Sequence, residues 1–119
     1  MFKIKDNNTH ITRGDRGDII FTVSNYHFQL GDEIIFTVKK HFNADEPVLR
    51  KIITIDNSTE GKDTIVISLE KEDTSIGKLI NKPAIYEYDI SLNSDITIIG
   101  YDENGAKQFI LYPEGSNDE

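Results

Sequence analysis

Several residue types and patterns are missing from this sequence, and each absence excludes a class of protein. The 119 residues include no cysteine, no tryptophan and one methionine. Without cysteine the chain has no disulfide framework, no thiolate metal site and no thiol nucleophile, so apolar burial and backbone pairing must hold the fold. No apolar run approaches the roughly 20 residues that span a bilayer, and residues 1–10 lack the apolar stretch of a signal peptide. We therefore expect a soluble, untargeted protein without a membrane partner.

Basic residues are in the minority. The chain has 21 acidic and 13 basic residues, which gives a formal net charge of −8 at pH 7. A molecule of this charge repels phosphate backbones and anionic lipids, so no nucleic acid is expected as a partner. The length fits one domain, which we place at residues 1–112. Residues 113–119 are polar and acidic and are predicted to form a disordered tail.

The strongest pattern that is present is the alternation of apolar and polar residues in short segments between turn residues. In DIIFTVSN, the side chains of Ile19, Phe21 and Val23 fall on one face, and DEIIFTVKK repeats the pattern around Phe36. Similar segments follow at residues 48–55, 63–69, 84–92, 95–102 and 106–113. About seven to eight such segments, at intervals of roughly 8 to 12 residues, predict an all-β chain folded as an antiparallel β-sandwich.

Turn residues predict how these segments connect. The Gly31-Asp32 dipeptide is predicted to form a turn that lets the first two segments lie antiparallel. The Asn104-Gly105 dipeptide is the one that a two-residue type I′ turn prefers, so we predict a C-terminal hairpin between the last two segments. In residues 70–80 a helical pattern is broken by Gly77, which predicts a crossover with at most one or two helical turns.

The tripeptide Arg-Gly-Asp occurs twice in succession, at Arg13–Asp15 and Arg16–Asp18. The glycines permit the positive φ of a tight reversal, and the aspartates can accept hydrogen bonds from nearby backbone amides. No cysteine framework indicates the extracellular setting in which this tripeptide serves as an adhesion signal. We therefore interpret the repeat as a bend that leads into a strand.

Candidate ligands for a metal are sparse. His10, His27 and His41 lie in separate segments without the short spacing of a zinc site. The sequence DENG at Asp102–Gly105 faintly matches a calcium loop, but the further carboxylates and the terminal glutamate are missing, so a hairpin turn is favoured. No metal and no cofactor are expected.

Catalytic motifs are equally weak. No serine lies in a nucleophile elbow, no glycine-rich loop precedes a helix, and none of the many acidic pairs has a distinctive setting. We expect that the protein is not an enzyme.

The order of the segments resembles a family of small phage and prophage structural proteins. The similarity covers residues 11–111 and is to the immunoglobulin-like domain at the N-terminus of baseplate upper proteins, from tailed phages of Gram-positive bacteria. In that family a Gly-Asp turn leads into each of the first two long strands. An acidic E-D-T then precedes a tyrosine-rich strand that ends in Y-D-I, matched here by Glu72–Thr74 and Tyr88–Ile90. The crossover sequence SIGKLINKPAIYEY departs from the family.

This resemblance implies an immunoglobulin-like fold and a non-enzymatic role as a tail or baseplate accessory protein of the virion, assembled in the bacterial cytoplasm. It implies docking to other phage structural proteins and to copies of itself as a homo-oligomer. Recognition of a host receptor is not implied, because the chain matches only the N-terminal module.

The residues give a candidate interaction surface of their own. Residues 48–55 read as an exposed edge strand with apolar side chains on both faces, and an edge strand can pair with a strand of a partner. The candidate residues are Arg50, Ile52 and Thr54 on this strand, together with Tyr101 and Tyr112 as exposed aromatics. The alternative is a carbohydrate-binding module for cell-surface glycans, which predicts two or three coplanar exposed aromatics.

Overall fold

The structure is a computed structural model that describes residues 1–77 and 81–114. The described part contains nine strands and one helical turn. They are β1 (Phe2–Lys5), β2 (Asn8–Thr12), β3 (Gly17–Thr22), β4 (Glu33–Lys39), β5 (Leu49–Thr54), β6 (Thr64–Leu69), α1 (Lys71–Thr74), β7 (Ala84–Leu92), β8 (Ile96–Ile99) and β9 (Lys107–Tyr112).

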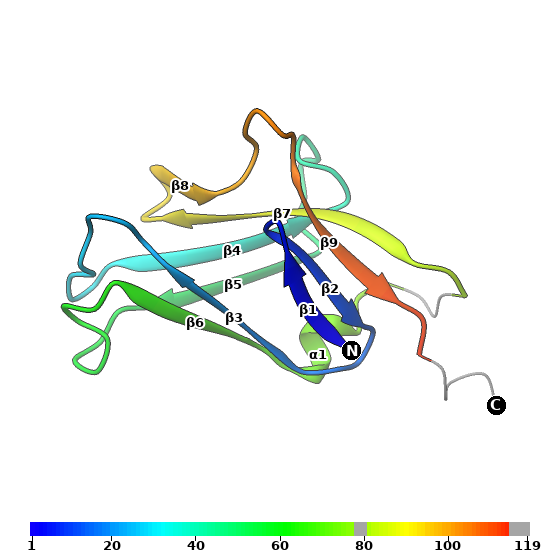
Figure 1. Ribbon diagram of the computed structural model, residues 1–119, viewed down its shortest axis with the longest axis horizontal. Helices are drawn as coiled ribbons and strands as arrows, with labels where there is room; N and C mark the ends of the chain where they lie inside the picture. Colours follow the sequence, from blue (N-terminus) through cyan, green and yellow to red (C-terminus); the bar gives the residue numbers. More distant parts are fainter. Residues whose placement is uncertain (78–80, 115–119) are drawn as a thin grey trace.

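The strands form two sheets that pack as a sandwich (Figure 1). The larger sheet has the order β1-β2-β9-β7-β4-β5, and the smaller sheet consists of β3 and β6. Strand β7 is long enough to pair with two strands along one side, with β9 over its first half and with β8 over its second half. The predicted all-β sandwich is confirmed. One pair departs from the antiparallel prediction, because β2 and β9 run parallel.

The apolar side chains that alternate with polar ones along the strands fill the space between the sheets, as the sequence predicts. On β3 and β4 the side chains of Ile19, Phe36 and Val38 are at most 2% exposed. On β7, Tyr88, Ile90 and Leu92 point inward as well. The buried cluster draws on both sheets, with Ile11, Ile19, Phe21, Phe28, Ile34, Phe36, Val38, Ile55, Ile65, Ile67, Leu69, Tyr88, Ile90, Leu92, Phe109 and Leu111. Each fully buried side chain of this kind stabilises the fold by roughly 1.5 to 3 kcal/mol.

The predicted antiparallel pair between the first two segments is wrong. Strand β3 pairs with β6, whereas β4 pairs with β5 and β7 in the other sheet. The connection between β3 and β4 is long enough to cross from one sheet to the other. The crossing is stabilised because it buries Phe28 in the core, where this side chain is 1% exposed. Turn residues show where a chain reverses, but they do not show to which sheet it returns.

Asp32 holds the end of this crossing connection. Its carboxylate accepts hydrogen bonds from the Tyr26 hydroxyl at 2.6 Å, the Gln29 amide at 2.9 Å and the Asn93 side chain at 3.1 Å. Burial raises the pKa of Asp32, but these hydrogen bonds together outweigh burial, so the pKa lies below its usual value. The Asp32 carboxylate therefore fixes the connection against the turn that follows β7.

The predicted C-terminal hairpin is also wrong. Strand β8 folds back on β7, and the turn between them places both Asn93 and Ser94 at positive φ, as a type I′ turn requires. At the expected site Gly105 has positive φ, but Asn104 does not. Residues Asp102 and Gly105 do form a tight turn with two backbone hydrogen bonds, but the strands on either side of it are not paired with each other.

The crossover after β6 contains a single helical turn, α1, in agreement with the predicted one or two turns. Glu70 and Asp73 form a capping box at its start. Part of the predicted acidic tail is described, and there the Glu114 carboxylate accepts a hydrogen bond from Arg13 at 3.0 Å. The rest of that tail, residues 115–119, lies outside the described residues.

The first Arg-Gly-Asp tripeptide is part of the structure rather than a displayed loop. The Arg13 guanidinium donates to the backbone carbonyls of Ser75, Ile76 and Gly77 at 3.0, 3.3 and 2.9 Å and to Glu114. Its side chain is only 12% exposed. One guanidinium thus joins the start of the chain, the crossover after α1 and the segment after β9.

The two glycines and Asp15 of the repeat are also constrained. Gly14 has a φ of +87°, and a Cβ added to Gly17 would lie 2.4 Å from the Phe2 ring. Asp15 forms an ion pair with the N-terminal amine. These contacts support the interpretation of the repeat as a bend that leads into β3.

The two arginines of the repeat provide a matched test. Arg13→Ala leaves three carbonyls without their donor, so we expect the free energy of unfolding in urea to fall by about 2 to 3 kcal/mol. The Arg16 side chain is 79% exposed and lies 3.5 Å from Glu70, so Arg16→Ala changes it by less than about 0.5 kcal/mol. Equal effects of the two substitutions would contradict the assigned role of Arg13.

Candidate functional site

Three of the five candidate residues lie together at the edge of the larger sheet. Strand β5 ends the order of that sheet and, within residues 1–77 and 81–114, pairs with β4 alone. Arg50, Ile52 and Thr54 alternate along it and point to the outer face, where Ile52 is 49% exposed. Ile52 lies opposite Ile35 of β4, which is 4% exposed although it is not part of the core cluster. The outer face is therefore partly apolar beside this edge.

The backbone of the same three residues faces away from the sheet. The Ile55 amide donates to the Asp32 carbonyl at 2.8 Å, which makes position 55 a hydrogen-bonded position of the β4–β5 pair. Hydrogen-bonded positions alternate along an antiparallel pair, so the amides and carbonyls of Arg50, Ile52 and Thr54 point toward the free edge. An incoming strand would find three donors and three acceptors there.

Lys51 holds this edge strand in place. Its ammonium donates to the Ser68 carbonyl of β6 at 2.9 Å and to the Asp73 carboxylate at 2.6 Å. The Lys51 and Asp73 side chains are 25% and 17% exposed. The contact links β5 to the smaller sheet and to α1.

The two candidate tyrosines lie elsewhere. Tyr112 ends β9, which is separated from β5 by β7 and β4, and its ring stacks on His10 with 5.9 Å between centroids. The Tyr112 hydroxyl and His10 Nδ1 are 2.8 Å apart. Tyr101 lies in the connection between β8 and β9 and is 64% exposed. The structure therefore divides the five candidate residues among three places.

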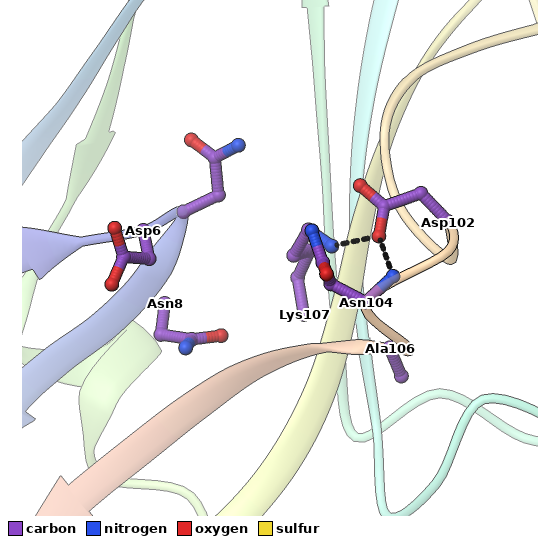
Figure 2. Close-up of a pocket in the computed structure, with 7 residues that line it drawn as sticks. Asp6, Asn8, Asp102, Asn104, Ala106 and Lys107 are labelled. Carbon is purple, nitrogen blue, oxygen red and sulfur yellow. Dashed lines mark hydrogen bonds and ion pairs between the residues drawn. The ribbon is translucent and has the colours of Figure 1, made fainter.

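A large polar cleft lies at the other end of β9 from Tyr112 (Figure 2). Its volume is about 510 Å³, and it lies between the β1–β2 turn and the Asp102–Gly105 turn. Asp6 and Asn8 face it from one side, and Asp102, Asn104 and Lys107 from the other. Its walls are mostly polar, and Ala106 contributes apolar surface.

Lys107 supplies a buried ammonium group to this cleft. Its side chain is 7% exposed, and its ammonium donates to Asp102 Oδ1 at 2.7 Å and to the Gly105 carbonyl at 3.2 Å. Asp102 Oδ1 also accepts from the Asn104 amide at 2.8 Å. The hydrogen bond from Lys107, followed by that from Asn104, lowers the pKa of Asp102. The carboxylate of the DENG turn thus pairs with the chain's own ammonium.

The remaining candidate ligands are not brought together. Within the described ranges no three His, Cys, Asp or Glu side chains are grouped so that they could hold a metal ion. The same part of the chain contains no helix with the length and apolar character needed to cross a membrane.

Comparisons with known proteins gave no match: no protein family, no curated protein and no solved structure is similar to this chain at the level of significance required.

The Asp102–Lys107 pair predicts a pH dependence. The pKa of Asp102 is lower in the folded protein than in the unfolded chain, so its stabilisation is present above the unfolded pKa of about 4 and is lost as the pH falls through the folded pKa. We expect Asp102→Asn to lower the urea midpoint at pH 7. Toward pH 3 the variant and the wild type should converge.

Asp18→Asn is the matched control for this experiment. Asp18 is exposed on β3 and forms no ion pair in the described part of the structure. Its variant should keep the wild-type midpoint at both pH values. A constant difference between Asp102→Asn and the wild type from pH 7 to pH 3 would contradict the assigned pair.

Proposed function

We propose that this protein is a non-enzymatic docking module that binds a partner strand at the free edge of β5. The observation that carries the proposal is the combination found at Arg50, Ile52 and Thr54. Their side chains point to the outer face, and their backbone amides and carbonyls point toward the free edge. Addition of a strand to such an edge gives affinity through backbone hydrogen bonds and specificity through alternate side chains.

A second copy of the chain is the partner that fits this edge. Two β5 strands can pair antiparallel about a two-fold axis at Ile52, which places Ile52 opposite its own copy and Arg50 opposite Thr54. A register centred on Arg50 would instead place two arginines opposite each other, and like charges in that position are destabilising. The register centred on Ile52 therefore avoids this repulsion, and its product is one continuous sheet across two molecules.

The assignment to a phage particle is a further part of the proposal. It depends on the order of the segments from residue 11 to residue 111, and an all-β sandwich is compatible with the immunoglobulin-like fold that this order implies. The seven-and-two division of the described strands departs from the more even division of immunoglobulin domains. The genes beside the coding sequence test this part. Tail or baseplate genes would support it, and a metabolic operon would contradict it.

A charge at the centre of the edge tests the docking. Small interfaces associate weakly, so light scattering or sedimentation should cover about 10 μM to about 1 mM. We expect the wild-type mass to rise from 13.5 kDa toward twice that value. Ile52→Lys places two ammonium groups opposite each other in the proposed register, so this variant should stay at 13.5 kDa throughout.

Ile20→Lys is the control for that substitution. Ile20 is 60% exposed at the centre of β3, on the outer face of the smaller sheet. This variant should associate like the wild type, with circular dichroism confirming that both variants are folded. The proposal is contradicted if the wild type remains a monomer over the whole range, or if Ile20→Lys prevents association and Ile52→Lys does not.

A further inference from the structure

A second concave site lies on the outer face of the larger sheet, next to the β5 edge, because Thr37 in its lining lies directly opposite Arg50. It is a hollow of about 200 Å³ over β4 and β7, bordered by the segment after β4 and by the connection from β8 to β9. The side chains that matter in it belong to Thr37, Lys39, Phe42, Glu87, Asp89 and Tyr101. The hollow is open to solvent, and Tyr88 of the buried core also lines it.

Two aromatic rings form one side of the hollow. The centroids of Phe42 and Tyr101 are 4.8 Å apart, and their planes are inclined by 49°. Both rings remain exposed, at 56% and 64%. The carbohydrate alternative predicted coplanar aromatics, whereas these two are tilted, so they make a corner for one small ring rather than a platform for a long chain. Exposed aromatic pairs of this kind are typical of binding sites.

The position of Phe42 is fixed in advance. Glu87 of β7 accepts a hydrogen bond from the Phe42 backbone amide through its carboxylate. This contact ties the segment after β4 to the middle of the sheet, so the corner is already formed without a ligand. A preformed site loses less conformational entropy when it binds.

The polar groups of the hollow are mixed in charge. Thr37 lies directly opposite Asp89, and Lys39 lies directly opposite Glu87. The two carboxylates disfavour an anionic ligand, and Lys39 offsets one of their two negative charges. Carboxylates accept hydrogen bonds, an ammonium donates them, and threonine hydroxyls do both. This set suits a neutral ligand whose hydroxyls both donate and accept.

Asp89 is the acceptor most open to such a ligand. Its side chain is exposed, and in the part of the chain that the structure describes it accepts no hydrogen bond. The protein atoms around it still restrict its hydration and raise the pKa of its carboxyl, an effect that Lys39 partly opposes. A carboxylate at the floor of an open hollow keeps one side toward solvent, so the Asp89 side chain is accessible to a ligand.

We propose that this hollow binds a single neutral sugar ring. The apolar face of the ring lies against Tyr101 and Phe42, its hydroxyls donate to Asp89, and its oxygens accept from Lys39. This site adds ligand recognition to the docking proposed for β5 and does not depend on it, because no side chain of β5 lines the hollow.

The proposal is tested with methyl glycosides of glucose, galactose, mannose and N-acetylglucosamine as probes. Each is titrated into the ¹⁵N-labelled protein to about 50 mM, well above the millimolar dissociation constant of a weak complex. The Ile52→Lys variant is titrated as well, so that failure of docking and failure of sugar binding are distinguished. We expect saturable amide shifts around Asp89 and Tyr101 with at least one glycoside.

Two substitutions and one control locate the binding. Tyr101→Ala should weaken binding about tenfold through loss of the stacked ring, and Asp89→Asn should weaken it through loss of the anionic acceptor. Tyr112→Ala removes a tyrosine from the same sheet face outside the hollow and should leave binding unchanged. The proposal is overturned if no glycoside produces shifts, if the shifts arise elsewhere, or if Tyr101→Ala and Asp89→Asn bind like the wild type.

Discussion

The rest of the structure depends on one constraint, which is that the apolar inner face of β4 and β7 must be covered. Phe36 and Ile90 lie directly opposite each other there, and each is 0% exposed. Two strands, β3 and β6, cannot by themselves cover a sheet of seven, so part of the cover comes from the crossing connection, which contributes Phe28. Every inward position on these strands must be apolar. The groups that can bind a partner are therefore confined to the outer face, the edges and the connections.

The sequence predicts the strands well because burial alternates residue by residue, and that signal is local. Pairing is not local. The Asn104-Gly105 dipeptide has the composition of a hairpin turn, yet the hairpin forms at Asn93 and Ser94, where the returning strand finds the free second half of β7. The segment from Phe2 to Lys5 is short and largely exposed, and its pairing with β2 carries little of the period-two pattern.

The two candidate sites also differ in how far the sequence alone predicts them. The edge at Arg50, Ile52 and Thr54 is predictable, because apolar residues on both faces of one strand are a local feature of the sequence. The pair of Phe42 and Tyr101 is not, because its members come from connections far apart in the chain and meet only when β4 and β7 are neighbours. The sequence did not identify Phe42 as a candidate binding residue. The one local feature that distinguishes Phe42 from a core phenylalanine is that its neighbours in the sequence are polar.

Both proposed sites use the outer surface of the sandwich. At the β5 edge the outer face and the free backbone groups belong to the same residues, because the alternation that points Ile52 outward also turns its amide away from β4. In the hollow, the Lys39–Glu87 and Thr37–Asp89 positions face each other because β4 and β7 are in register. Strand β4 thus takes part in both sites, through its register with β5 at the edge and its register with β7 in the hollow.

Amide hydrogen exchange, followed residue by residue at low and at high protein concentration, tests the central claim most directly. The account predicts that the amides of Arg50, Ile52 and Thr54 exchange rapidly in dilute solution and slow down when the protein is concentrated, while Lys51 and Ile53 are protected at both. Protection of all five amides in dilute solution, or rapid exchange of Arg50, Ile52 and Thr54 at every concentration, would contradict it.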